Sequence, residues 1–582
     1  MMRQEDMLRQ RLPILTGAMI FAGVVLILRV IWFQFPQDPR VAAEFAIQRD
    51  ANSGRTENIE SPRGEIYDRN GNPLAVNTVQ YGVWISPTLI SDVADTAPKL
   101  ARILSNWDEL ELFTLLRDST NAAEFLGVVD GEAWRQIRDL GLNFAIRSDR
   151  IQRRVYPQGS LGAQVIGFVS GVGEDATGNY GIEGYYETQL AGSFESAEVS
   201  NIPFDLPEDF TAQLESGANL VLTLDRDVQF LAESELQRAI TETGATGGTI
   251  IIMDPRTGDI LGMASYPSFD PNTYYEVDNP LHLQNPAISG LYEPGSIFKV
   301  LTVAAALELG VVTPDWTYND QGAFDVGGYR IQNWDRRAHG EVDVEQILVQ
   351  SLNVGAAILA VDELQWDFYQ MMARFGIGRT TRIDLAGEIS GVMRTPNQSA
   401  TWSESDLATN SFGQGLSVTP LQMLTAINAI ANDGIMMKPR VVYQMIDGDN
   451  IITSEPQATR VISADTAEIV TNMMISVIQG DVDGRAQVPG YTIAGKTGTA
   501  EIPSGGGYET DAWIMSFVGF LPADNPQVSV LIKLDRPTSG RWASEVAAPV
   551  FSRLVSRLVV LLEIPADDVR IGLQSAGASV GN

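Results

Sequence analysis

The amino-acid sequence predicts an α+β protein, with an antiparallel sheet flanked by helices, and three observations support this class. A β-branched run, a Pro/Gly-containing turn and a second apolar run predict an antiparallel hairpin over residues 247–265. Three further strand-like runs with short connections, at 491–501, 512–522 and 527–535, predict an antiparallel meander. An amphipathic segment at 544–563 then predicts a closing helix. Strands grouped in this way, with helices on their faces, are typical of the α+β class.

The first forty residues predict a membrane anchor. Residues 12–35 are apolar except for Arg29 and polar positions near the ends, and one helix over them could span roughly 30 Å of hydrocarbon. Three arginines precede this segment, which favours a cytoplasmic tail at residues 1–11 and an external remainder. A cleaved signal peptide is the alternative interpretation, but the apolar run is long and no small-residue cleavage site follows it directly. We therefore expect a single-pass membrane protein.

Length and charge narrow the classes of function. The chain has 582 residues, which is too long for one ordinary domain. Its 40 Lys and Arg against 73 Asp and Glu give a net charge of −33, which disfavours nucleic-acid binding. Cysteine is absent, so disulfides, thiolate metal ligands and cysteine nucleophiles are excluded. The two histidines, His282 and His339, fit no zinc-binding pattern, and the sequence therefore predicts no metal site.

The chain beyond the anchor divides into two regions and a tail. Residues 36–215 mix short apolar pieces with Gly, Pro, Asn and Asp, and a strand–turn–strand pattern occupies 61–77. Residues 216–565 carry the hairpin, the meander and the intervening helical segments. The last residues, 566–582, are small and polar, which predicts a disordered tail.

Four charged residues of the first region are candidates for buried ion pairs, namely Arg63, Arg153, Arg154 and Glu183. A buried charge is costly unless it is paired, so charges of this kind usually hold a scaffold together. For these four residues we favour this structural interpretation over a catalytic one.

The segment LYEPGSIFKVLTV (residues 291–303) contains a candidate reactive pair. A Pro-Gly pair breaks the chain, and Ser296 and Lys299 follow in the first turns of a predicted buried helix that ends at Gly310. Positions i and i+3 are neighbours on a helix, so the hydroxyl and the amine can meet. Burial and the positive helix end both lower the pKa of such an amine, which makes it a plausible base. Taken alone, the S-x-x-K pattern is weak, and it favours a helix cap followed by a snorkelling lysine over a catalytic pair.

Two later segments strengthen the catalytic interpretation. In VQSLNVGAA (residues 349–357), Ser351 and Asn353 lie two residues apart at the start of an apolar helical run. In IAGKTGTAE, polar side chains lie on a predicted strand whose glycines let another backbone or a ligand approach closely. The polar residues of this strand are Lys496, Thr497 and Thr499. S-x-x-K, S-x-N and K-T-G in this order are the signature set of penicillin-interacting serine acyltransferases.

The chain resembles the class B penicillin-binding proteins, which are monofunctional D,D-transpeptidases of bacterial cell-wall synthesis. The resemblance runs from the anchor to about Glu563 and rests on several segments besides the three catalytic motifs. These segments are PRGEIYDRNG (62–71), DPRTGDILGMASYPSFDPN (254–272), SFGQG (411–415), VTPLQM (418–423), FVGFLP (517–522) and AAPVF (547–551).

The resemblance implies a domain organisation. An N-terminal pedestal of the dimerisation type would occupy residues 36–215, after one transmembrane helix. A transpeptidase domain of the penicillin-binding/β-lactamase-like fold would occupy residues 216–565. In the pedestal, the residues that the resemblance makes structural are Arg63, Gly64, Asp68, Arg154 and Glu183.

The resemblance also implies a mechanism that needs no cofactor. Ser296 would attack the D-Ala-D-Ala carbonyl of a peptidoglycan stem peptide, and Lys299 would take its proton. Ser351 would relay a proton to the leaving D-Ala, and Asn353 would bind the peptide amide. An amine of a neighbouring stem peptide would then resolve the acyl-enzyme and give a cross-link. β-Lactams should acylate Ser296 for the same reason.

The third motif would bind the substrate carboxylate. Lys496 would keep the local field positive and depress the pKa of Lys299 further. The hydroxyls of Thr497 and Thr499, with Gly498 between them, would bind the carboxylate or orient the donor peptide. The backbone N–H groups of Ser296 and Thr499 would form the oxyanion hole.

The resemblance implies a place in the cell and a set of partners. The protein would lie in the bacterial cytoplasmic membrane with its N-terminus inside and its catalytic domain outside. A SEDS-type glycosyltransferase and other divisome or elongasome membrane proteins would assist it, in septal or lateral wall synthesis. The segment around the nucleophile looks slightly closer to the division type.

Three other classes of protein share part of this pattern. A class A enzyme would need a glycosyltransferase domain where this chain carries pedestal motifs. A β-lactamase or antibiotic sensor would share S-x-x-K but would not need such a pedestal. A non-catalytic structural member of the divisome would use residues 36–215 to hold partners together, and a Ser296→Ala variant would then retain its function.

Overall fold

The computed structural model describes residues 17, 19–27, 29, 55–199, 216–397, 402–481, 483–505 and 507–572. The chain forms two compact units, Met1–Ser61 with Ser193–Glu215, and Pro62–Gly192 with Ser216–Asn582. In the first unit, β1 (Arg55–Glu60) pairs antiparallel with β8 (Phe194–Val199). No helix among the described residues has both the length and the apolar character to cross a membrane. Most of the predicted anchor at 12–35, and the tail at 1–11, lies outside the described residues.

A five-stranded antiparallel sheet forms the centre of the second unit, in the order β11-β10-β24-β23-β22. The strands are β10 (Gly247–Met253), β11 (Ile260–Tyr266), β22 (Ala494–Ser504), β23 (Gly507–Leu521) and β24 (Val528–Asp535). The predicted hairpin and meander are therefore confirmed. The outer strand β22 pairs only with β23 within the described part of the chain, which leaves one edge of β22 for the site described below.

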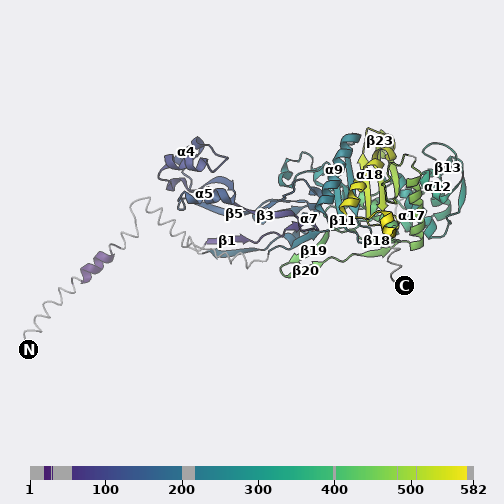
Figure 1. Ribbon diagram of the computed structural model, residues 1–582. Helices are drawn as coiled ribbons and strands as arrows, with labels where there is room; N and C mark the ends of the chain where they lie inside the picture. Colours follow the sequence, from purple (N-terminus) through teal and green to yellow (C-terminus); the bar gives the residue numbers. More distant parts are fainter. Residues whose placement is uncertain are drawn as a thin grey trace, which may run out of the picture. The chain divides into compact units, whose positions relative to one another are not determined.

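The two faces of this sheet carry different helices. Alternate residues of β10, such as Ile250 and Ile252, pack with α9 (Arg226–Thr243) and α18 (Ala543–Leu561). The two helices lie side by side (Figure 1). The intervening residues, such as Ile251, face a larger core that contains α11 (Lys299–Glu308) and α16 (Pro420–Ala431). This alternation follows from the two-residue period of a strand. The closing helix predicted at 544–563 is confirmed as α18.

The predicted helix after the Pro-Gly pair begins differently from expectation. Its first residues form the 3₁₀ turn η6 (Gly295–Phe298), and α11 (Lys299–Glu308) follows. Gly295 has φ +58°, a conformation that side chains other than hydrogen rarely allow, and it sets up the tighter turn. Gly310, at φ +65°, follows the end of α11 as predicted.

A second sheet, of seven strands, joins distant parts of the chain. Its order is β20-β19-β9-β2-β3-β4, and β5 also pairs with β3. The strands are β2 (Ile66–Tyr67), β3 (Pro73–Ile85), β4 (Glu124–Val129), β5 (Ile146–Val155), β9 (Asn219–Leu222), β19 (Val442–Asp447) and β20 (Asn450–Thr453). Strands β2 and β3 confirm the strand–turn–strand prediction, and the Asp68 carboxylate accepts two backbone N–H bonds that hold their turn.

Shorter elements complete the unit. Helices α3 (Val93–Ala101), α4 (Glu109–Asp118) and α5 (Gly131–Asp139) share a separate apolar core with β3, β4 and β5. Further α-helices are α6 (Ala163–Ile166), α7 (Gly181–Tyr185), α8 (Glu187–Leu190), α10 (Pro286–Ser289), α12 (Val344–Val349), α13 (Asn353–Ile358), α14 (Asp367–Arg374), α15 (Glu404–Asn410), α16 (Pro420–Ala431) and α17 (Ala464–Gln479). The remaining strands are β6 (Phe168–Ser170), β7 (Thr177–Asn179), β12 (Thr317–Asp320), β13 (Ala323–Val326), β14 (Tyr329–Gln332), β15 (Gly340–Asp343), β16 (Val392–Met393), β17 (Leu416–Ser417), β18 (Ile435–Met437) and β21 (Ala458–Arg460).

A buried carboxylate, Glu183, gathers two arginines from far away in the sequence. Its oxygens lie 2.7 Å from Arg63 Nη2 and 2.7 Å from Arg154 Nε, and the Tyr156 hydroxyl donates to it at 3.2 Å. Arg63 also pairs with Glu187 at 2.6 Å. The predicted ion pairs of Arg63, Arg154 and Glu183 are thus confirmed.

The prediction for Arg153 is wrong. Neighbouring residues of a strand face opposite sides, so while Arg154 on β5 reaches Glu183, Arg153 is exposed. Gly64 lies beside the same cluster, where Arg154 Nη1 donates to its carbonyl at 2.8 Å. A Cβ on Gly64 would lie 1.9 Å from the carbonyl oxygen of Ala218, so the two backbones pack in contact there.

Replacing Glu183 by Gln should lower the free energy of unfolding by about 3 to 5 kcal/mol, because it leaves the buried guanidinium of Arg154 without a carboxylate. Arg63 keeps its pair with Glu187. Thermal or urea unfolding of the whole protein measures this. Glu132→Gln is the matched control, since Glu132 pairs with Arg135 at 2.9 Å on an exposed surface and such pairs contribute about 1 kcal/mol or less. Equal effects of the two substitutions would contradict the prediction.

The predicted disordered tail starts too early. Residues 567–572 are helical, and Arg570 is buried against the carboxylates of Asp524 and Asp567, at 2.6 and 2.8 Å. Most residues of this segment are small and polar, so its composition did not indicate that one arginine would be buried and paired. Residues 573–582 lie outside the described residues.

Candidate active site

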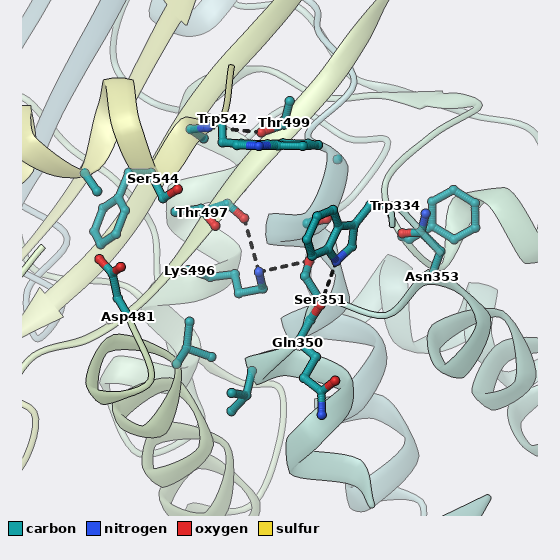
Figure 2. Close-up of a pocket in the computed structure, with 18 of the residues that line it drawn as sticks. Trp334, Gln350, Ser351, Asn353, Asp481, Lys496, Thr497, Thr499, Trp542 and Ser544 are labelled. Atoms are coloured by element: carbon teal, nitrogen blue, oxygen red, sulfur yellow. Dashed lines mark hydrogen bonds between the residues drawn. The ribbon is translucent and has the colours of Figure 1, made fainter. Parts of the chain in front are cut away.

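The three sequence motifs meet in one pocket of about 670 Å³. Six of the predicted site residues line it: Ser296, Ser351, Asn353, Lys496, Thr497 and Thr499. They come from η6, from the ends of α12 and α13, and from the edge strand β22. Figure 2 shows Lys496 in the middle of this pocket, with hydrogen bonds to Ser351 and Thr497. The other two residues predicted for this site, Lys299 and Gly498, are not among the residues that line the pocket.

Close packing holds the turn of Ser296 against β22. A Cβ on Gly295 would lie 2.9 Å from the carbonyl oxygen of Thr499, and a Cβ on Gly498 would lie 2.8 Å from that of Pro294. Both contacts are closer than side chains allow, so only glycine fits at these two positions. The backbones of Ser296 and Thr499 are thereby held at adjacent places in the pocket wall, while the Ser296 side chain stays partly exposed.

Lys299 is fully buried and lies within reach of both serines. Its Nζ is 3.1 Å from Ser296 Oγ, 3.2 Å from Ser351 Oγ and 2.7 Å from the Ser351 carbonyl oxygen. Burial, and to a lesser extent the charge of Lys496, hold the pKa of Lys299 well below its usual range. A neutral amine has two N–H groups, which suit the oxygens of Ser351, and one lone pair, which suits the Ser296 hydroxyl. The geometry therefore permits proton transfer from Ser296 to Lys299.

Ser351 links the two lysines. Its Oγ lies 3.2 Å from Lys299 Nζ and 3.2 Å from Lys496 Nζ. Ser351 has φ +55°, an unusual backbone conformation for a non-glycine residue, and such strain is often found at functional sites. Two residues later, Asn353 begins α13, and its Nδ2 donates to the Gln332 carbonyl at 3.0 Å.

Lys496 and Thr499 form the other wall of the pocket. Burial lowers the pKa of Lys496 to about 8, so this amine is mostly cationic at neutral pH. Thr499 Oγ1 accepts a hydrogen bond of 3.2 Å from the backbone N–H of Ala543 at the start of α18. This bond connects the β22 wall with α18.

The sequence motifs did not reveal the aromatic residues at this pocket. Trp334 and Trp542 line it, and their rings pack edge to face with centroids 5.3 Å apart (Figure 2). They come from segments about 200 residues apart in sequence, so no local pattern could have paired them.

Glu293 is another residue near the pocket that the sequence motifs did not include. Its position immediately before the Pro-Gly pair is a sequence signal that could have identified it. Its carboxylate accepts bonds of 3.1 Å from Gly415 N and 3.1 Å from the Tyr508 hydroxyl. Burial raises the pKa of Glu293 to about 7. Glu293 therefore ties the nucleophile segment to two further segments near the pocket.

Comparison with known proteins places the chain in a family. Residues 248–556 match the penicillin binding protein transpeptidase domain, and residues 58–201 match the penicillin-binding protein dimerisation domain. Along the sequence, the transpeptidase domain therefore follows the dimerisation domain. The chain belongs to the class B penicillin-binding proteins.

Individual relatives cover most of the chain. Stage V sporulation protein D of Bacillus subtilis is 33% identical, over 85% of this chain and 78% of the relative. Peptidoglycan D,D-transpeptidase FtsI of Escherichia coli is 29% identical, over 98% of this chain and 95% of the relative. Among solved structures, penicillin binding protein 3 of Mycobacterium tuberculosis complexed with aztreonam superposes with a TM-score of 0.67 at 29% identity, covering 88% of this chain and 98% of that one.

Proposed function

We propose that this protein is a peptidoglycan D,D-transpeptidase that cross-links stem peptides through an acyl-enzyme on Ser296 and that binds penicillin covalently at the same atom. The observation that carries the proposal is the fully buried amine of Lys299, whose lowered pKa leaves it able to accept a proton, 3.1 Å from Ser296 Oγ. Family membership supports the same activity, since relatives such as FtsI are named peptidoglycan D,D-transpeptidases.

The first half of the reaction forms the acyl-enzyme. Ser296 Oγ attacks the carbonyl carbon of the penultimate D-Ala as its proton passes to Lys299 Nζ. The backbone N–H groups of Ser296 and Thr499 stabilise the oxyanion that results. When the C–N bond breaks, the leaving amine takes a proton through Ser351 Oγ, which lies 3.2 Å from the Lys299 amine. Free D-Ala departs.

The second half transfers the acyl group. The amine of a neighbouring stem peptide attacks the ester carbonyl, a new amide bond forms, and the C–O bond to Ser296 breaks. Lys299 takes the proton that the attacking amine loses and passes it to Ser296 Oγ as the C–O bond breaks, which restores the enzyme. Lys496, Thr497 and Thr499 bind the substrate carboxylate beside Gly498, and Asn353 binds the peptide amide of the donor. No cofactor takes part in these steps.

The proposal includes the domain organisation and the location. The pedestal comprises residues 36–215 and the transpeptidase domain residues 216–565, and 12–35 anchors the chain in the bacterial cytoplasmic membrane with residues 1–11 inside. A SEDS-type glycosyltransferase and other divisome or elongasome membrane proteins are the proposed partners. The apolar run, the preceding arginines and the family resemblance support this arrangement.

Mass spectrometry of the protein after exposure to penicillin tests the function. We expect one adduct, on the peptide that contains Ser296, and we expect it to persist for many minutes. An adduct on another residue contradicts the proposed mechanism, and rapid hydrolysis of the adduct would favour a β-lactamase instead. Incubation with a synthetic D-Ala-D-Ala peptide and an acceptor amine should release D-Ala and form the transfer product.

The rate of acylation by an anionic penicillin should fall as the pH rises through about 8, the pKa of Lys496. Below that pH the lysine is cationic and attracts the carboxylate of the ligand, and above it the charge is lost. Stopped-flow measurement of acylation from pH 7 to 9 tests this. Lys496→Arg stays charged throughout, so its profile should be flat over this range whatever its absolute rate. A wild-type profile that is flat there would contradict the assignment.

A further inference from the structure

We propose that Asn333, held by the buried carboxylate of Asp320, is a positioning residue that fixes the start of α13 and with it Asn353 and Ser351. The inference rests on the proposed function and extends it to residues that do not belong to the three motifs. Neither Asn333 nor Asp320 lines the pocket.

Helix α13 needs a partner for its first backbone N–H groups, because the first turn of any helix leaves these donors unpaired. A Ser, Thr, Asp or Asn just before the helix usually accepts one of them. Here the preceding residue is Leu352, which has no side-chain acceptor. Instead, Val354 N donates to Asn333 Oδ1 at 3.1 Å, across 21 positions of sequence. The loop after β14 thus supplies the cap.

The orientation of the Asn333 carboxamide is determined by its surroundings. Its Oδ1 faces the N–H of Val354, while its Nδ2 donates to Asp320 Oδ2 at 2.7 Å and to the Arg337 carbonyl at 3.3 Å. Turning the amide over would bring an NH₂ group against an N–H group and a carbonyl against a carboxylate. The side chain is 2% exposed, so water cannot replace these partners.

Asp320 anchors this amide with a carboxylate that is 1% exposed. Its Oδ1 accepts from Gly322 N at 3.1 Å, and its Oδ2 accepts from His339 N at 3.2 Å as well as from Asn333. In the described part of the chain, hydrogen bonds rather than a cation stabilise this buried charge. His339 lines the pocket, so Asp320 also fixes the backbone at that part of the wall.

The same loop holds the catalytic turn from its other side. Asn353 Nδ2 donates to the carbonyl of Gln332, the residue immediately before Asn333. Both the side chain of Asn353 and the next backbone N–H are therefore bonded to the Gln332–Asn333 pair. Because Ser351 adjoins this turn in a left-handed conformation, a displacement of α13 would move both residues relative to Lys299. Misplacement of reacting groups by about 1 Å can lower a rate roughly 100-fold.

An exchange of the two side chains tests the inference. Asn333→Asp places two buried carboxylates against each other, and Asp320→Asn places two amides there. The double variant restores one donor facing one acceptor between the two side chains, while the Arg337 carbonyl and the His339 N–H lose their partners. We expect each single substitution to lower the first-order acylation rate constant of Ser296 by about 10- to 100-fold, and the double variant to recover part of the loss.

The readout must separate positioning from folding. Intact-protein mass spectrometry gives the fraction of molecules that penicillin can label, and stopped-flow gives the rate constant of the molecules that react. If Asn333 and Asp320 act by positioning the catalytic residues, their substitution lowers the rate constant while the labelled fraction stays high. A lower labelled fraction or melting temperature with an unchanged rate constant would overturn the inference, as would a double variant no better than the worse single one.

Two controls complete the test. Asp325→Asn changes an exposed carboxylate on β13 of the same loop region, paired with Arg330 at 3.1 Å, and should leave the rate constant unchanged. Asn333→Ser introduces no charge, so it supplies the measurement if Asn333→Asp does not fold, and an unchanged rate constant in it also overturns the inference. Failure to label wild-type Ser296 would instead contradict the proposed function.

Discussion

Replacing Ser296 by Ala should abolish both acylation by penicillin and transfer of the stem peptide, with a fall in kcat of about a million-fold as for loss of other catalytic serines. The hydroxyl oxygen is the atom that forms the covalent bond, and alanine offers no substitute. Lys299 and Ser351 remain in place, but they only transfer protons and cannot replace the missing nucleophile. Labelling with a fluorescent penicillin and release of D-Ala from a synthetic peptide measure the two activities.

The same variant separates an enzyme from a scaffold. Ser289→Ala is a suitable control, because the Ser289 hydroxyl donates at 2.8 Å to the carbonyl of Asn285, the residue before α10. Cells that depend on the protein should grow with the control variant and fail with Ser296→Ala. Full growth with Ser296→Ala would mean that the protein acts by holding partners together, and the transpeptidase proposal would then fall.

Replacing Lys299 by Met should slow acylation by about 10²- to 10⁴-fold, the usual contribution of a general base. Methionine has a similar length and suits the buried position, while it can neither accept the Ser296 proton nor bond to Ser351. Lys299→Arg should be as slow, because a guanidinium stays protonated and cannot act as a base. Stopped-flow acylation with a chromogenic β-lactam gives the rate constants.

Lys99→Met is the matched control, since Lys99 pairs with Asp95 at 2.6 Å on an exposed surface. The labelled end point should be the same for all variants, because Ser296 is intact and only its rate of reaction changes. An acylation rate for Lys299→Met within threefold of wild type would show that another group takes the proton.

The elements that sequence reasoning predicted well have local signals. The hairpin of β10 and β11 and the meander of β22 to β24 follow from alternation and turn residues, which a few neighbouring positions define. Ser296 and Lys299 are likewise three residues apart, so any helical turn brings them together. Their meeting with Ser351 and Lys496 is different. The resemblance to a family predicted it, since no periodicity connects segments so far apart.

The features that sequence reasoning missed depend on contacts between distant segments. The cap of α13 comes from Asn333 because the local position holds Leu352, so the usual signature is absent. Arg153 and Arg154 are chemically identical, and only the direction of β5 decides that the second one reaches Glu183. The 3₁₀ turn at Ser296 depends on Gly295, whose neighbour across the pocket wall is a carbonyl of β22.

Strand β9 has a consequence for anyone who shortens this protein. It pairs in parallel with β2 on one side and antiparallel with β19 on the other, so the first residues after 216 complete a sheet that begins at Ile66. A truncated catalytic fragment starting at 216 would keep β19 and lose β2. Its newly bare strand edge would offer unpaired N–H and C=O groups to other molecules, and such edges promote aggregation. Retaining residues 62–77, fused ahead of 216, should keep a trimmed enzyme soluble for crystallisation.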